Sequence, residues 1–167
     1  MNPDPIFVRI ERTDLSTWLR ESPSLWAFPF VLIVHAWGMG FLAGTSAAMD
    51  LRVLGLLRTI PFPAMARFLP FAWIGLWINA VSGVLLLIAY PSKALTNPLF
   101  YFKLFCIAAA VVLLRLLTRG VLRRTPEPVP VPLKFRRMAG ISLALWVTAI
   151  TAGRLLAYTY SRLTTEC

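Results

Sequence analysis

No charged residue appears between Glu21 and Asp50, and this interval is long enough to cross a lipid bilayer. A membrane-spanning helix needs about 20 mostly apolar residues. Because backbone polar groups in hydrocarbon must be paired internally, such a segment folds as a helix. The sequence from Ser24 onward, SLWAFPFVLIVHAWGMGFLAGTSAAMD, therefore predicts that the chain is anchored in a membrane.

Three further apolar segments follow the first and define the fold class. Of the 167 residues, 58% are hydrophobic and only 14% are charged. Four spans with short loops account for such a chain and leave no room for a soluble domain. The prediction is an all-α fold, an integral membrane four-helix bundle. We expect spans at about residues 24–49, 68–90, 98–118 and 138–159, with an N-terminal tail at 1–23 and a C-terminal tail at 160–167.

The N-terminal tail contains one segment with helix signals. Asp14 or Ser16 can cap a short helix carrying Trp18, and such a helix would lie flat in the membrane interface. The alternative is a frayed tail.

The spans and the last loop carry their own local signals. Pro29 lies one turn inside the first expected span, where it should bend the helix and free a backbone carbonyl. Gly40 and Gly44 form the small-xxx-small pair typical of closely packed membrane helices. In the loop at 119–137 four alternating prolines favour an extended polyproline conformation.

The formal net charge of +10 would suggest nucleic acid as the partner of a soluble protein. Here the basic residues follow the positive-inside rule of membrane proteins instead, so we expect no nucleic-acid partner. Ten basic residues lie in or beside the loops at 50–67 and 119–137, whereas seven basic residues lie on the side of the two termini. This asymmetry predicts a multi-pass protein of the bacterial inner membrane with both termini in the periplasm.

His35 is the only histidine and lies in the middle of the first span. Asn79 lies about 11 residues in from the loop end of the second span, and His35 lies about 11 residues in from the opposite end of the first. Both are therefore about 16 Å deep, near the middle of the membrane. Asn79 shares a helix face with Gly75, Ser82 and Gly83, and this face should point into the bundle. The sequence therefore predicts that His35 and Asn79 can meet.

An ionisable residue inside a membrane span is a candidate functional residue. His35 has three interpretations, which the residues leave open. It can be an axial ligand of a b-type haem held between the helices. It can belong to a proton or metal relay with Asn79 and Ser82. It can also be structural, bonded to Asn79 or to the carbonyl freed by Pro29.

The haem interpretation assigns roles to other residues. Gly38 would give the porphyrin room, and Lys103 and Arg154 would pair with its propionates. With a single histidine, the chain cannot ligate the iron with two histidines. The iron would be five-coordinate, or would take a methionine, Lys103 or a histidine of another subunit as its second ligand.

Two motifs resemble known membrane proteins. HAWGMGFLAGTSAAMDLRVLG resembles the first-span signature of an uncharacterised family of small bacterial membrane proteins, and NPLFYFKLFCIAAAVVLL resembles the third span of that family. More distantly, both are similar to the copper-resistance protein D domain and to HemJ-type protoporphyrinogen oxidase, a group associated with b-type haem. The resemblance implies roles for His35, Arg52 and Lys103. HemJ-like proteins carry a further histidine in the third span, and nothing here replaces it.

The leading hypothesis is a haem b-binding redox component or subunit of a membrane oxidoreductase complex, acting as a homo-oligomer or with other membrane subunits. The rival is a cofactor-free structural or assembly subunit. A copper or small-solute conduit ranks third, because copper prefers several Met or Cys on one pore-facing side. We also expect no Asp or Glu within the spans, which argues against a proton path. The copper hypothesis lacks such a set of ligands, because four methionines of the chain do not share one helix face: Met39, Met49, Met65 and Met138.

Overall fold

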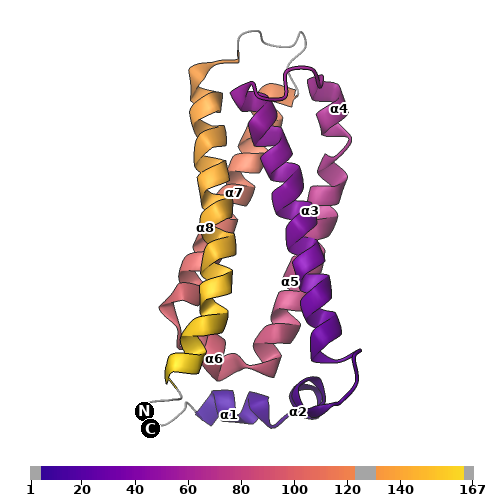
Figure 1. Ribbon diagram of the computed structural model, residues 1–167, viewed down its shortest axis with the longest axis vertical. Helices are drawn as coiled ribbons and strands as arrows, with labels where there is room; N and C mark the ends of the chain where they lie inside the picture. Colours follow the sequence, from indigo (N-terminus) through magenta and orange to yellow (C-terminus); the bar gives the residue numbers. More distant parts are fainter. Residues whose placement is uncertain (1–4, 123–130, 164–167) are drawn as a thin grey trace.

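Four long helices dominate the computed structural model, which describes residues 5–122 and 131–163. The fold is all-α, as the sequence predicts (Figure 1). The long helices are α3 (Phe28–Leu54), α5 (Leu69–Ala89), α7 (Pro98–Leu117) and α8 (Leu133–Leu163). Shorter elements connect or flank them: α1 (Pro5–Glu11), α2 (Asp14–Glu21), α4 (Phe62–Ala66), α6 (Pro91–Leu95) and the π-helical turn η1 (Thr118–Leu122).

The bundle is built from two helix pairs. Helix α3 packs chiefly against α5, and α7 packs chiefly against α8; the α3–α8 interface joins the pairs. In Figure 1 α4 lies at the upper end of the bundle, whereas α1, α2 and α6 lie at the lower end. The end with α4 is called the upper end, and the end with α1, α2 and α6 is called the lower end.

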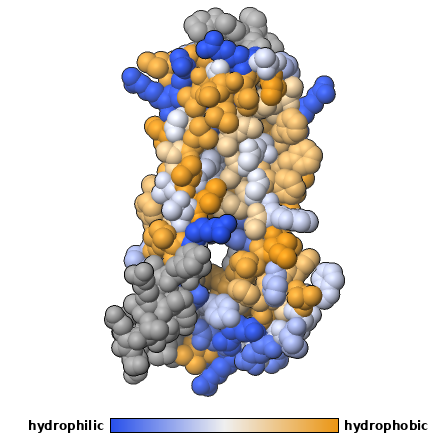
Figure 2. Space-filling view, viewed as in Figure 1, coloured by the Kyte–Doolittle hydropathy of each residue, from blue (hydrophilic) through white to orange (hydrophobic). Residues whose placement is uncertain are grey.

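The surface of the bundle is that of an integral membrane protein. Four helical segments are long and apolar enough to cross a bilayer: Phe28–Leu54, Phe62–Ala89, Pro98–Val121 and Leu133–Leu156. Figure 2 shows a hydrophobic surface between two hydrophilic ends. Large apolar side chains such as Trp37 and Trp77 are exposed on this surface, at 67% and 70%. An exposed apolar surface of this extent fits lipid rather than water, so the chain is a four-span membrane protein.

Each long helix buries one stripe of residues spaced three or four apart, as the helical period requires. Small residues on these stripes, such as Ala72 and Ala110, allow close packing. A cluster of six residues, called the central cluster here, fills the middle of the bundle: Leu42, Ala43, Ala72, Ala110, Leu114 and Trp146. A second apolar cluster lies at the upper end, with Val53, Phe62, Leu117, Val121 and Ala139.

The start of the first span differs from its prediction. Helix α3 begins at Phe28 rather than near residue 24, so Pro29 lies in the first turn. A proline is tolerated there because the first-turn N–H groups have no partner within the helix. The expectation that Pro29 bends the helix from inside is therefore wrong.

The end of the first span differs as well. Helix α3 continues past residue 49 to Leu54, where Gly55 adopts φ +94° and donates to the carbonyls of Arg52 and Leu51. This left-handed glycine is a common helix terminator. Asp50 consequently lies inside the span and is fully buried. The expectation that the spans contain no acidic residue is therefore wrong.

The close crossing of two helices uses other glycines than predicted. A Cβ on Gly38 would lie 2.7 Å from the Asn79 backbone nitrogen, and one on Gly75 would lie 2.7 Å from the Gly38 carbonyl oxygen. Gly40 and Gly44 have no neighbouring atom within 4 Å of such a Cβ. The α3–α5 crossing therefore depends on Gly38 and Gly75, and Gly40 and Gly44 do not form a packed pair within the described chain.

The short helix predicted in the tail is α2, and its cap is Thr13, whose hydroxyl accepts from the Ser16 backbone N–H. Helix α2 packs under the α3–α5 pair: the Ser16 hydroxyl donates to the Ile88 carbonyl at 3.0 Å, and Leu19 packs with Val31 and Ala89.

The last loop is described only in part. Of the prolines in the predicted polyproline segment, Pro132 immediately precedes α8, whereas those at positions 126, 128 and 130 lie outside the described residues.

The close crossing of α3 and α5 predicts that two glycine-to-alanine substitutions change the free energy of unfolding by different amounts. Gly38→Ala should lower the free energy of unfolding by about 1–3 kcal/mol, because its methyl group forces α3 and α5 apart. Gly40→Ala should leave stability unchanged or raise it slightly, since alanine favours helix and the space is open. Thermal denaturation of both variants in detergent checks this, and equal losses would contradict the assigned crossing.

Candidate functional site

A layer of polar and small residues lies on the inward stripes below the central cluster. His35 comes from α3, Asn79 and Ser82 from α5, Lys103 from α7 and Gly153 from α8. Contacts link them within each helix pair: Ser82 bonds His35, and Lys103 lies against Gly153. Lys103 lies within electrostatic range of His35. These five residues are called the histidine layer.

The hydrogen bonds of Ser82 determine the tautomer of His35. The Ser82 hydroxyl donates to the Ile78 carbonyl at 2.6 Å, and its oxygen lies 3.0 Å from His35 Nδ1. A hydroxyl has one hydrogen to donate. Ser82 therefore accepts from Nδ1–H, and the neutral ring keeps a lone pair on Nε2.

The Asn79 side chain binds the backbone of His35. Its side-chain nitrogen donates to the His35 carbonyl at 3.0 Å. The same nitrogen lies 3.5 Å from both ring nitrogens. A donor aligned with one ring nitrogen would be clearly closer to that nitrogen than to the other, so Asn79 is aligned with neither. Among the described residues, Nε2 therefore lacks a well-aligned hydrogen-bond partner.

Glycines leave space around the imidazole and the ammonium group. A Cβ on Gly83 would approach His35 Cε1 to 3.3 Å, and a Cβ on Gly153 would approach Lys103 Nζ to 3.3 Å. Figure 2 shows an opening through the molecule in its lower half, below the middle of the hydrophobic surface. The two helix pairs are thus less tightly joined below the central cluster than within it.

Lys103 has no carboxylate partner within the described part of the chain. Its aliphatic stem lies against Gly153, and its side chain is half-buried. A half-buried ammonium group without a counter-ion favours the binding of an anionic group.

The remaining predicted site residues lie elsewhere. Gly38 lies at the α3–α5 crossing, against backbone atoms of α5. Arg52 lies at the upper end, where it donates to the Ile60 carbonyl and lies 4.1 Å from the centre of the Phe62 ring. Arg52 is 17 residues after His35 on one helix, or about 25 Å away, so it cannot reach the histidine layer. Arg154 follows Gly153 directly, and its side chain is exposed.

Two residues of the layer, Ser82 and Gly153, and the neighbouring Gly83 were not among the residues predicted to hold a haem, although the relay interpretation includes Ser82. Ser82 and Gly83 carry a recognisable signal, because they follow Asn79 at helical spacing on the inward face. Gly153 carries no such signal, since its role depends on the packing of α8 against α7.

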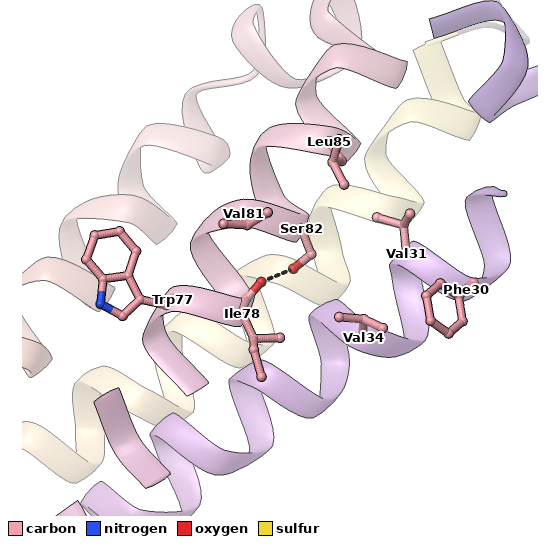
Figure 3. A pocket seen from close by; sticks show the side chains of 8 residues that line it. All are labelled: Phe30, Val31, Val34, Trp77, Ile78, Val81, Ser82 and Leu85. Atoms are coloured by element: carbon pink, nitrogen blue, oxygen red, sulfur yellow. Dashed lines mark hydrogen bonds between the residues drawn. The ribbon is translucent and has the colours of Figure 1, made fainter. Parts of the chain in front are cut away.

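A groove of about 380 Å³ lies between α3 and α5 next to this layer. Figure 3 shows Val31 and Val34 of α3 facing Ser82 and Leu85 of α5 across it. Ser82 contributes a hydroxyl that is already bonded to Ile78, and the other lining surface is almost entirely apolar. The groove therefore suits a hydrocarbon chain and offers no free polar group. The further lining residues are Phe30, Trp77, Ile78 and Val81.

The described residues contain no group of three or more His, Cys, Asp or Glu side chains that could hold a metal ion. His35 is thus the one strong nitrogen ligand that the layer offers, and a metal bound there needs most of its ligands from elsewhere. A porphyrin supplies four nitrogen ligands to its iron and meets this requirement.

Comparison with known proteins returns no match. No protein-family model matches the chain, no curated protein matches it, and no solved structure matches it. The structure therefore assigns the chain to the four-span membrane proteins and to no known family.

The hydrogen bonds of Ser82 predict one tautomer of the single histidine. Isotope-labelled histidine should give, in nitrogen NMR of the detergent-solubilised protein, a protonated Nδ1 and an unprotonated Nε2. Ser82→Ala should shift the ring towards a mixture of tautomers, because the acceptor of Nδ1–H is gone. Thr148→Ala, which removes a hydroxyl bonded within α8, is the control. A protonated Nε2 in the unaltered protein would contradict this assignment.

Proposed function

We propose that this membrane protein binds haem b in the histidine layer and acts as a redox component or subunit of a membrane oxidoreductase complex. The observation that carries the proposal is the position of the Ser82 oxygen, which lies 3.0 Å from His35 Nδ1 and 2.6 Å from the Ile78 carbonyl. This arrangement assigns the proton of the neutral ring to Nδ1 and the lone pair to Nε2. Ligating histidines usually have their second ring nitrogen fixed by such a bond, which also makes the ligand more basic.

The chain's own residues fit the group. His35 Nε2 would ligate the iron, and Ser82 and Asn79 would hold the ring and backbone of that ligand in place. Lys103 would offer its ammonium group to a propionate. Gly83 and Gly153 present no side chain at positions next to His35 and Lys103. Bound haem supplies one-electron chemistry, and the central cluster keeps water out from above.

The chain has no second histidine that could hold the haem. A further histidine would have to come from another subunit, so a homo-oligomer or a neighbouring membrane subunit is part of the proposal. The exposed Arg154 is a second cation on α8 next to the layer, and we assign it a weaker part in holding propionates.

We further propose that the upper end faces the cytoplasm of a bacterial inner membrane. Exposed basic side chains are dense at this end, and the positive-inside rule then places both termini in the periplasm. The exposed basic residues of the upper end include Arg58, Arg67, Arg119, Lys134, Arg136 and Arg137.

A cofactor-free structural subunit is the second candidate, favoured by a specific observation. The His35–Ser82–Asn79 bonds join α3 to α5 beside the Gly38–Gly75 crossing. Such a network can serve packing alone, because interhelical hydrogen bonds contribute about 0.6 kcal/mol each in membrane proteins.

The test is a haem titration of the purified protein, followed by optical spectra in the oxidised and dithionite-reduced states. The unaltered protein should develop a Soret band and sharpened reduced bands, and His35→Ala should lose them because the axial ligand is gone. Added imidazole should restore binding to His35→Ala by occupying the space of the missing side chain. Ser82→Ala should weaken haem affinity by about 10–100-fold, the usual effect of removing such a supporting bond.

Lysine variants provide the matched control. Lys103→Met should weaken haem binding, whereas Lys93→Met should not, because Lys93 lies in α6 near the Tyr90 ring. A folded protein that gives no Soret band, also when isolated with its native membrane partners, would refute the haem proposal. That result would favour the structural subunit.

A further inference from the structure

A second polar layer lies on the α3–α8 interface, on the upper side of the central cluster. The Trp146 indole N–H donates to the Ser46 hydroxyl at 2.8 Å. One turn further towards the upper end, Asp50 of α3 lies beside Ser142 of α8. Because the two helices are antiparallel, the Ser46–Trp146 bond aligns Asp50 with Ser142.

Asp50 is buried without a satisfactory partner. Its relative exposure is 0%, as is that of Ser142. Within the described residues, neither carboxylate oxygen of Asp50 makes a hydrogen bond, and the Ser142 hydroxyl makes none either. An ionised carboxylate in this position would be a desolvated charge without compensation, which proteins avoid.

The cationic groups of the described elements around Asp50 do not compensate this charge. Arg52, on the same helix, is bonded to the Ile60 carbonyl and stacks on Phe62. Arg115 of α7 lies 4.7 Å from the centre of the Trp73 ring. Arg58 is bonded to the Gly55 carbonyl. Other cations of the neighbouring elements have exposed side chains: Arg67, Arg119, Lys134, Arg136 and Arg137.

A proton is the ligand that this geometry fits. A neutral carboxylic acid has an O–H that Ser142 can accept, and it removes the uncompensated charge. A metal cation would need several further oxygen ligands, and the nearby Ser46 hydroxyl already accepts from Trp146.

We propose that Asp50 is a proton-binding site inside the bundle, a carboxylic acid that is neutral at physiological pH and shares its proton with Ser142. The bound proton comes from water: the carboxylate and one proton combine to the acid, and no other reactant is needed. Helix α3 ends one turn beyond Asp50, at Leu54, so the proton exchanges with the aqueous phase at the upper end. The site is independent of haem binding, because it shares no residue with the histidine layer.

The test uses the full-length protein in detergent or lipid nanodiscs, with aspartate isotope-labelled at its side-chain carboxyl carbon. The chain contains only three aspartates, Asp4, Asp14 and Asp50, so carbon NMR resolves few signals. Asp4→Asn and Asp14→Asn identify two of them without disturbing the buried layer, and the remaining signal is that of Asp50. We expect this signal to be that of a protonated acid at neutral pH and to become a carboxylate only in alkali.

Asp50→Asn provides a second measurement, since asparagine has the shape of the neutral acid. A proton held by the folded protein and not by the unfolded chain makes stability fall as pH rises. The melting temperature of the unaltered protein should therefore fall as the pH rises from the ordinary aspartate range, about 4, to the pH at which Asp50 ionises in the folded protein, and Asp50→Asn should remove part of this fall. Asp14→Asn should not.

Two results would overturn the proposal. One is a carboxylate signal from Asp50 at neutral pH in the folded protein. The other is an Asp50 signal that responds to added sodium ions at constant pH and not to pH, which would make the site a cation site. If Asp50→Asn fails to fold, the NMR measurement still decides, because it leaves Asp50 unaltered.

Discussion

The close approach of α3 and α5 at Gly38 and Gly75 determines much of the arrangement around it. Backbone atoms of the two helices come so near that a methyl group at either position would collide with the partner. Only at such a distance can the short side chain of Ser82 reach the ring of His35 and Asn79 reach the His35 carbonyl. In hydrocarbon, where no water can replace these bonds, this crossing makes the buried histidine tolerable.

Polar side chains inside the bundle occur in two layers with the central cluster between them. The lower layer contains the His35–Ser82 bond of the α3–α5 pair and the Lys103–Gly153 contact of the α7–α8 pair. The upper layer joins α3 to α8 through the Ser46–Trp146 bond and the Asp50–Ser142 contact. Apolar residues such as Leu42 and Leu114 separate them. Charge in one layer is therefore insulated from the other by closely packed side chains.

The two helix pairs are held together unevenly along the bundle. The central and upper clusters join them over the upper half. At the lower end, α2 packs against the α3–α5 pair through Ser16 and Leu19. The histidine layer lies between these regions, where Gly83 and Gly153 take the place of larger side chains.

The sequence by itself determined the four spans, their order and the meeting of His35 with Asn79, because length, hydropathy and depth are properties of single segments. Asn97, directly before Pro98, is another local signal, and its side chain caps α7 by accepting from the Leu99 N–H. Only the tertiary structure decided which glycines form the crossing, that Arg52 lies far from His35, and that Asp50 is buried opposite Ser142. These facts depend on the rotation and register of one helix against another. Both are fixed by side chains distant in sequence, such as Ser46 and Trp146, whose contact no local pattern encodes.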